Sequence, residues 1–235
     1  MRFPDPLLHG TLVKRYKRFM ADVVLDTGET VTAHCANSGS MLSVRESGSE
    51  VWLSPARNPD RKLRYTWEIV RIGEAMVGIN TQHPNAIVAE AVADGTIEEL
   101  SGYASLRREV KYGKNSRIDL LLEDDGKPTC YVEVKNVTMR RDLAGGPAEF
   151  PDAVTARGAK HLVELGDMVA AGHRAVMMFL VQRTDCSRFT LAADIDPAYA
   201  EAYALARSRG VEALCYGCAV TPEEIKVTSP VPLEI

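Results

Sequence analysis

The chain has 235 residues, 46% of them hydrophobic and 26% charged, with a formal net charge of −4. This balance is typical of a globular protein, and it excludes a low-complexity chain and a molecule that is strongly basic throughout. No apolar run reaches the roughly 18 residues that a membrane helix needs, and the start of the chain lacks the apolar stretch of a signal peptide. Five cysteines at scattered spacings predict reduced thiols in a cytoplasmic protein.

Charge is unevenly distributed along the chain. Residues 1–80 hold 11 Lys and Arg and 9 Asp and Glu, a net charge of +2. Residues 81–235 hold 17 Lys and Arg and 23 Asp and Glu, a net charge of −6. A basic patch that binds phosphate is therefore compatible with the N-terminal part, although the whole molecule is acidic.

Residues 1–80 predict a small all-β domain. Short β-rich stretches alternate with turns that contain Gly, Ser or Asn; they are HGTLVKRY, FMADVVL, ETVTAHC, EVWLSP, TWEIVRI and AMVGIN. Strands this short, with no long helix between them, favour a small barrel or sandwich. We prefer an OB-fold barrel, although propensity alone also allows an SH3-like barrel.

Residues 81–235 predict a mixed α/β domain, with the boundary near Thr81. Helices are expected over residues 80–95, 152–172 and 196–210, from their apolar stripes and from prolines near two of the starts. Strands are expected at LRREVKYG, SRIDLLLE, PTCYVEVKN, HRAVMMFLVQ and VEALCYGCAV, with RFTLAAD as an addition. The order of helix, three strands, helix and strand predicts an α/β layered domain.

Two carboxylates lie inside the apolar runs of one predicted hairpin, RIDLLLEDDGKPTCYVEVKN. A turn centred on Gly126 pairs residues whose numbers sum to 252, which sets Asp119 opposite Glu133. Side-chain alternation predicts that Lys135 shares the face of Glu133, while Ile118, Leu120 and Leu122 line the other face of their strand. Two like charges at this spacing destabilise a sheet unless a positive group joins them.

Two interpretations of this hairpin remain open. In the first, the acids lie on a solvated strand face and Lys135 neutralises them. In the second, Asp119 and Glu133 bind a hard cation, Mg²⁺ or Mn²⁺, and Lys135 positions the attacking water for phosphodiester hydrolysis.

The element order around RID and EVK resembles the PD-(D/E)xK nuclease superfamily, with Ile118 in place of the name-giving proline. The resemblance implies catalytic roles for Asp119, Glu133 and Lys135. It also implies a third acidic metal ligand on the first helix, where Glu90 is the match. Glu109, in the preceding strand, is an additional candidate acid.

A second resemblance covers nearly the whole chain. The segments LVKRYKRFMADV, HCANSGSM, NTQHPN, ELSGYASLRREVKYGKNSRIDLLL, CYVEVKNVT and FPDAVTARGAKHL are similar to the sugar fermentation stimulation protein A family. This resemblance implies an OB-fold domain, a nuclease-like domain, DNA binding without strong sequence preference, and a regulatory link to sugar metabolism.

Three basic segments are candidate nucleic-acid contacts, each with a solvated surface as the alternative. Basic groups neutralise phosphates, and an aromatic ring can stack on a base. One of the three segments is a loop between two predicted strands, which also contains the basic residues Arg57 and Arg64. The candidate residues are Lys14, Arg15, Tyr16, Lys17, Arg18, Arg61, Lys62, Arg157 and Lys160.

The sequence therefore favours a DNA-binding protein with a Mg²⁺-dependent nuclease-type site. A non-catalytic DNA-binding regulator that keeps the nuclease fold, and an enzyme that hydrolyses a non-nucleic phosphodiester, remain as alternatives. Cys215 and Cys218 have metal-ligand spacing, but without a second pair we interpret them as buried thiols.

Overall fold

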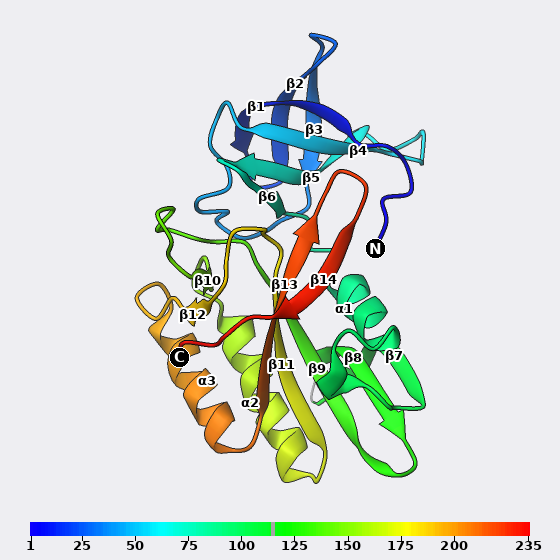
Figure 1. Cartoon of the computed structure of the whole chain (residues 1–235), viewed down its shortest axis with the longest axis vertical. Coiled ribbons are helices and arrows are strands. Elements are labelled where there is room, and N and C mark those ends of the chain that lie inside the picture. The colour runs from blue at the N-terminus through cyan, green and yellow to red at the C-terminus, as the bar shows by residue number, and fades with distance from the viewer. Residues whose placement is uncertain (114–115) are drawn as a thin grey trace.

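The protein folds into a β-barrel followed by an α/β domain (Figure 1). The structure, a computed structural model, describes residues 1–113 and 116–235; the predicted strand segments on either side of Lys114 and Asn115 are described, but these two residues are not. No helix in these ranges is long and apolar enough to cross a membrane.

The barrel has the predicted strands. Five of them close through a parallel pairing of β3 with β5, in which Cys35 lies beside Trp67, and β6 extends the sheet from β5. Inward-facing residues alternate with exposed ones, so Leu12, Val23 and Leu53 fill the interior. The OB-fold prediction is confirmed. The strands are β1 (Leu8–Tyr16), β2 (Met20–Leu25), β3 (Thr30–Cys35), β4 (Glu50–Pro55), β5 (Tyr65–Ile72) and β6 (Ala75–Gly78).

The α/β domain is built on a sheet with the strand order β14-β13-β11-β9-β8-β7. The parallel neighbours β9, β11 and β13 lie at its centre, and antiparallel strands flank them. The strands are β7 (Ser105–Tyr112), β8 (Ser116–Asp124), β9 (Lys127–Val137), β11 (Arg174–Val181), β13 (Glu212–Val220) and β14 (Ile225–Pro230). A separate parallel pair is formed by β10 (Ala148–Phe150) and β12 (Phe189–Leu191). Of these strands, β10 and β14 were not predicted.

Helices cover both faces of this sheet. The helix α1 (Pro84–Ala93) packs on one face, followed by the short 3₁₀ helix η1 (Glu98–Leu100). The helices α2 (Ala156–Ala170) and α3 (Pro197–Ser208) pack on the other face. Cys215 and Cys218 are buried in the apolar clusters of opposite faces, as two free thiols.

The barrel and the α/β domain share buried surface. Trp52 and Ile69 of the barrel belong to the same apolar cluster as Ile87 of α1 and Leu120 of β8. The backbone continues the contact, because the N–H of Gly78 donates to the carbonyl of Gln182 at 2.9 Å. The two domains are therefore packed together and not merely linked.

The middle of the hairpin has the predicted register, but the register shifts between Leu122 and Asp124, where Asp124 pairs with Lys127, and the predicted alternation fails. Leu120 pairs with Val132, and Leu122 with Cys130, so the sum of 252 holds for these pairs. However, Ile118 packs on the α2 face, whereas Leu120 and Leu122 pack on the α1 face. The prediction that all three share one face is wrong, because the alternation is interrupted at Asp119.

Candidate functional site

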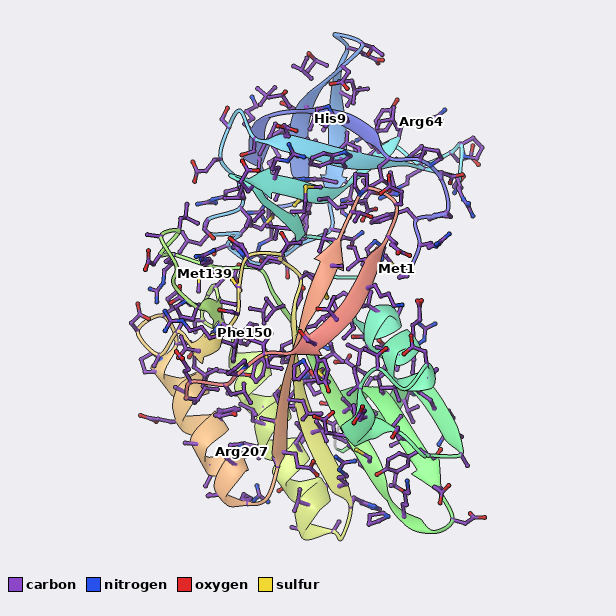
Figure 2. All side chains as sticks on the ribbon, viewed as in Figure 1. Met1, His9, Arg64, Met139, Phe150 and Arg207 are labelled. Atoms are coloured by element: carbon purple, nitrogen blue, oxygen red, sulfur yellow. The ribbon has the colours of Figure 1, made fainter. Side chains whose placement is uncertain are left out.

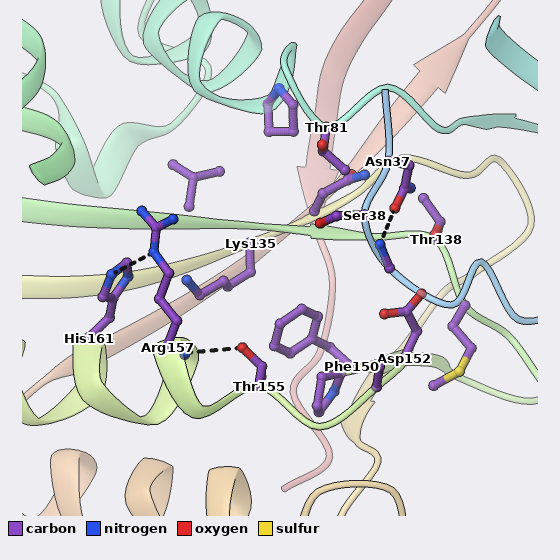
Figure 3. A pocket seen from close by; sticks show the side chains of 18 of the residues that line it. Asn37, Ser38, Thr81, Lys135, Thr138, Phe150, Asp152, Thr155, Arg157 and His161 are labelled. Carbon is purple, nitrogen blue, oxygen red and sulfur yellow. Dashed lines mark hydrogen bonds between the residues drawn. The ribbon is translucent and has the colours of Figure 1, made fainter. Parts of the chain in front are cut away.

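A cleft of about 550 Å³ lies where the barrel meets the α/β domain. Figure 3 shows Lys135, Arg157 and His161 along one part of it, and Asn37, Ser38 and Asp152 along another. Both predicted hairpin acids, together with Lys135, line this cleft. The residues on which the site depends are Arg18 from the barrel and Asn85, Asp119, Glu133, Lys135, Arg157 and His161 from the α/β domain.

Asp119 is fixed through both carboxylate oxygens. The backbone N–H of Val134 donates to Oδ2 at 2.7 Å, and Nδ2 of Asn85 donates to Oδ1 at 2.9 Å. The carboxylate thus accepts a backbone hydrogen bond from β9 and ties the start of α1 to the sheet.

Glu133 is almost fully buried, with 2% of its surface exposed. Nζ of Lys135 donates to its Oε1 at 2.6 Å, and Nδ1 of His161 also bonds this oxygen. The other oxygen, Oε2, is buried and has no hydrogen-bond partner among the described residues. A buried carboxylate oxygen left in this state is costly unless a ligand occupies the space beside it.

His161 is held in one tautomer by Arg157. Nε of Arg157 donates to Nε2 of His161 at 3.3 Å, so Nδ1 carries the hydrogen that His161 donates to Glu133. The ring of His161 is buried, at 4% exposure, and His161 was not among the site residues predicted from the sequence. A signal was present: Gly158, His161, Leu162 and Leu165 have the spacing of a buried helical stripe.

Asn85 and Glu109 contact the site near Asp119, where the strands β7 and β8 depart from regular geometry. Nδ2 of Asn85 bonds Oε1 of Glu109 as well as Oδ1 of Asp119. Glu109 has a φ of 56°, which is rare for a residue with a side chain, and it lies between the pairs that Arg108 and Val110 make with β8. Strand propensity does not reveal such a position, so Glu109 was only an additional candidate in the sequence and Asn85 was missed.

The two hairpin acids have opposite pKa shifts. Burial raises the pKa of Asp119 to about 6, and the charge of Glu133 adds to the rise, although the bond from Val134 opposes it. Burial also acts to raise the pKa of Glu133, but the hydrogen bond from His161 and the charge of Lys135 outweigh burial and hold this pKa below its ordinary value.

The donor set fits a hard divalent cation that keeps most of its own waters. Asp119 and Glu133 supply carboxylate oxygens, and Oε2 of Glu133 lacks any other described partner. In residues 1–113 and 116–235, no group of three or more Asp, Glu, His and Cys side chains is spaced as a complete metal centre. The two acids would therefore bind such an ion as a pair, with water as the remaining ligands.

Glu90 does not join this cluster. It lies on α1 outside the buried stripe of Ile87, Val88 and Ala91, and 56% of its side chain is exposed. Its carboxylate lies 2.8 Å from the N-terminal ammonium of Met1. The structure therefore gives no support to the expected metal role of Glu90, because packing of α1 turns this side chain away from the sheet.

Three residues of the N-terminal basic run are engaged within the barrel. Arg15 donates to the carbonyl oxygens of the loop between β3 and β4, including those of Asn37 and Gly39 at 3.0 Å. Nζ of Lys14 lies 3.7 Å from Asp22 and near the ring of Tyr16, whose hydroxyl donates to Asp22 at 3.0 Å.

The other basic candidates differ in their distance from the cleft. Arg18 and Arg157 line it, whereas Lys17, Arg61, Lys62 and Lys160 are exposed and are not among its lining residues. Lys160 instead lies beside Glu164 and Ser116. Arg64 belongs to the same loop as Arg61 and Lys62. In Figure 2 it lies on the opposite side of the molecule from the cleft residues Met139 and Phe150.

Both halves of the chain match known protein families. Residues 13–79 match the SfsA N-terminal OB domain, and residues 82–224 match the sugar fermentation stimulation protein RE domain. A sugar fermentation stimulation protein homolog from Rhodospirillum rubrum is 65% identical over 230 residues, which cover 94% of each chain. A homolog from Paramagnetospirillum magneticum is 61% identical over 235 residues, covering 100% of this chain and 98% of the relative.

A solved structure extends the likeness to the full fold. It is that of Pyrococcus furiosus SfsA in complex with Ca²⁺, with a TM-score of 0.89, 25% identity, and coverage of 100% of this chain and 98% of the other. Two family models that together span most of the chain, and relatives with more than half of their residues identical, establish that this chain belongs to the sugar fermentation stimulation protein family.

Proposed function

We propose that this protein binds DNA without strong sequence preference and hydrolyses phosphodiesters at a site that uses Mg²⁺ or Mn²⁺. The observation that carries the proposal is the buried Oε2 of Glu133, which has no hydrogen-bond partner among the described residues, in a side chain that lines the same cleft as Asp119 and Lys135. The Pyrococcus furiosus relative was solved in complex with Ca²⁺, which supports a divalent-cation site in this family.

Each residue of the cluster has a defined task in this proposal. Asp119 and Glu133 hold the cation, which when bound would stabilise charge on a phosphoryl oxygen and lower the pKa of water. Lys135 reaches the cleft with its Nζ already held by Glu133, so it is placed to orient the attacking water. Arg157 supplies a guanidinium on the α2 side, suited to a substrate phosphate.

A non-catalytic DNA-binding protein is the second candidate, and one observation favours it. Oε1 of Glu133 already accepts from both Lys135 and His161, so this oxygen is compensated without a cation. A site neutralised in this way can persist in a fold that binds nucleic acid but cleaves nothing.

Cleavage assays decide between the two candidates. Purified protein is incubated with single-stranded and double-stranded DNA and with RNA, in Mg²⁺, Mn²⁺ or EDTA. We expect metal-dependent cleavage by the wild type, loss of cleavage but not of DNA binding in Asp119→Asn and Lys135→Ala, and unchanged cleavage in Glu90→Gln. Intact substrates in both metals would sink the enzymatic proposal, and bound but uncut DNA would then favour the non-catalytic candidate.

A further inference from the structure

The proposed function leaves open what the barrel contributes to the cleft. We propose that the barrel completes the substrate site through Arg18, whose guanidinium contacts a backbone phosphate of the same strand that reaches Asp119 and Glu133. This inference rests on the proposed function and adds a substrate contact from the other domain. It makes the cleft one composite site instead of a nuclease-like domain with a separate binding module.

Arg18 differs from its basic neighbours in what it contacts. It lines the cleft together with both acids, Lys135 and Arg157, whereas the adjacent Lys17 does not. Within the described parts of the chain, Arg18 is exposed and its side chain forms no hydrogen bond or ion pair. The cleft thus has an uncompensated guanidinium on its barrel side and acids at the hairpin, a charge pattern that suits a phosphate chain crossing a metal site.

The turn that carries Arg18 has an unusual backbone. Lys17 has a φ of 46° and Arg18 a φ of 63°, between the ends of β1 and β2. Glycine and asparagine are the usual residues at such positions, and long basic side chains are not. Backbone strain of this kind is found at ligand sites in proteins, but Lys17 and Arg18 share it, so it marks the turn as a whole and not Arg18 in particular.

The barrel loop that lines the cleft, which follows β3, is held in place from both domains. The loop after β3 is bound by Arg15 from within the barrel and by Asp152 from the α/β domain. Oδ2 of Asp152 accepts from the N–H of Met41 at 2.8 Å, and the hydroxyl of Ser40 donates to the Asp152 carbonyl at 2.6 Å. This anchoring holds the barrel against the α/β domain, so Arg18 reaches the cleft without a domain closure.

The matched variants Arg18→Gly and Lys17→Gly test the inference. Each removes one positive charge from the same turn, and each relieves a positive φ, so both should raise the Tm by about 2–4 °C. Binding of a fluorescent 12-nucleotide single strand is measured by anisotropy in Ca²⁺ over a range of salt concentrations. We expect Arg18→Gly to weaken binding about tenfold and to lower the salt slope by about 0.7, with little change for Lys17→Gly.

The outcomes separate this inference from the proposed function. If the wild type binds the strand and the two variants weaken binding equally, Arg18 acts only as general surface charge and the inference is overturned alone. If the wild type binds no oligonucleotide and cleaves none, the proposed function and the inference fail together. A Tm that rises in both variants while only Arg18→Gly loses affinity supports the composite site.

Discussion

Asp119 is a carboxyl group kept in an environment that disfavours its charge. Its pKa is raised to about 6, mainly by burial. In the metal-free protein the folded state therefore holds this proton over a pH range in which the unfolded chain, with an ordinary Asp pKa near 4, has released it. The contribution of Asp119 to stability is thus largest below pH 4 and declines as the pH rises toward 6.

The pH dependence can be isolated with Asp119→Asn, which carries no titratable group at this position. We expect the free energy of unfolding of the wild type, relative to that of the variant, to fall by about 2–3 kcal/mol between pH 4 and pH 7. Urea unfolding in EDTA at several pH values measures this difference. A difference that stays constant with pH would contradict the assigned environment. Added Ca²⁺ should recover part of the loss for the wild type alone.

His161 acts on the site through Glu133. Replacement by leucine removes the donor to Oε1, so we expect about 10- to 100-fold weaker Ca²⁺ binding, as measured by calorimetry. Asparagine is the matched variant, because its side-chain N–H₂ lies near the position of Nδ1 and can still donate to Glu133. His161→Asn should therefore retain most of the affinity. Equal losses in both variants would indicate that His161 serves packing and not orientation.

At the scale of elements, the start of α2 positions two residues of the site. Thr155 caps the helix, with its hydroxyl accepting from the N–H of Gly158 at 3.0 Å, and Arg157 and His161 follow within the first two turns. We expect Thr155→Ala to lower the free energy of unfolding by about 1 kcal/mol, and Thr155→Ser to retain most of it. Urea unfolding of both variants checks this. If serine costs as much as alanine, the methyl group and not the cap is what α2 needs.

The hairpin shows how far the sequence carries a structural prediction. The pairing of its middle residues and the approach of Lys135 to Glu133 follow from a period of two, which is a local property, whereas the register shift beside the turn was not predicted. The interruption at Asp119 does not follow from this period; in the neighbouring strand Glu109, which lies between the residues that pair with Ile118 and Leu120, has a positive φ. Which acids come together therefore depends on the pairing of neighbouring strands. The residue pattern of a single strand does not reveal it.

The helix α1 also shows that a local sequence pattern does not reveal how an element packs in the fold. The helix expected over residues 80–95 is present as α1, Pro84–Ala93, but the metal role of Glu90 came from a family resemblance and not from the helix face. The apolar positions Ile87, Val88 and Ala91 fix the rotation of α1, and this rotation directs Glu90 outward. Asn85 reaches Asp119 from the first turn instead. The apolar period of a sequence predicts a helix, whereas tertiary packing sets the position and rotation of that helix on the sheet.

At the scale of the whole molecule, the cleft depends on how the barrel rests on the α/β domain. Trp52 and Ile69 lie in the cluster that also contains Ile87 and Leu120, so the barrel buries part of its outer surface in the second domain. Removing either domain would expose this apolar surface to water. We therefore expect the two domains to unfold together.

The chain carries separate spectroscopic probes for its two domains. Both tryptophans, Trp52 and Trp67, are in the barrel, whereas α1, α2 and α3 are all in the α/β domain. In guanidinium chloride, tryptophan fluorescence and helical circular dichroism should give coincident transitions, because the shared cluster couples the domains. Ile69→Ala removes buried contacts at this junction, and we expect it to shift both curves to lower denaturant concentration by the same amount. A fluorescence transition that moves away from the helical one would show that the barrel folds independently, and the composite cleft would then lack the fixed wall that brings Arg18 to the two acids.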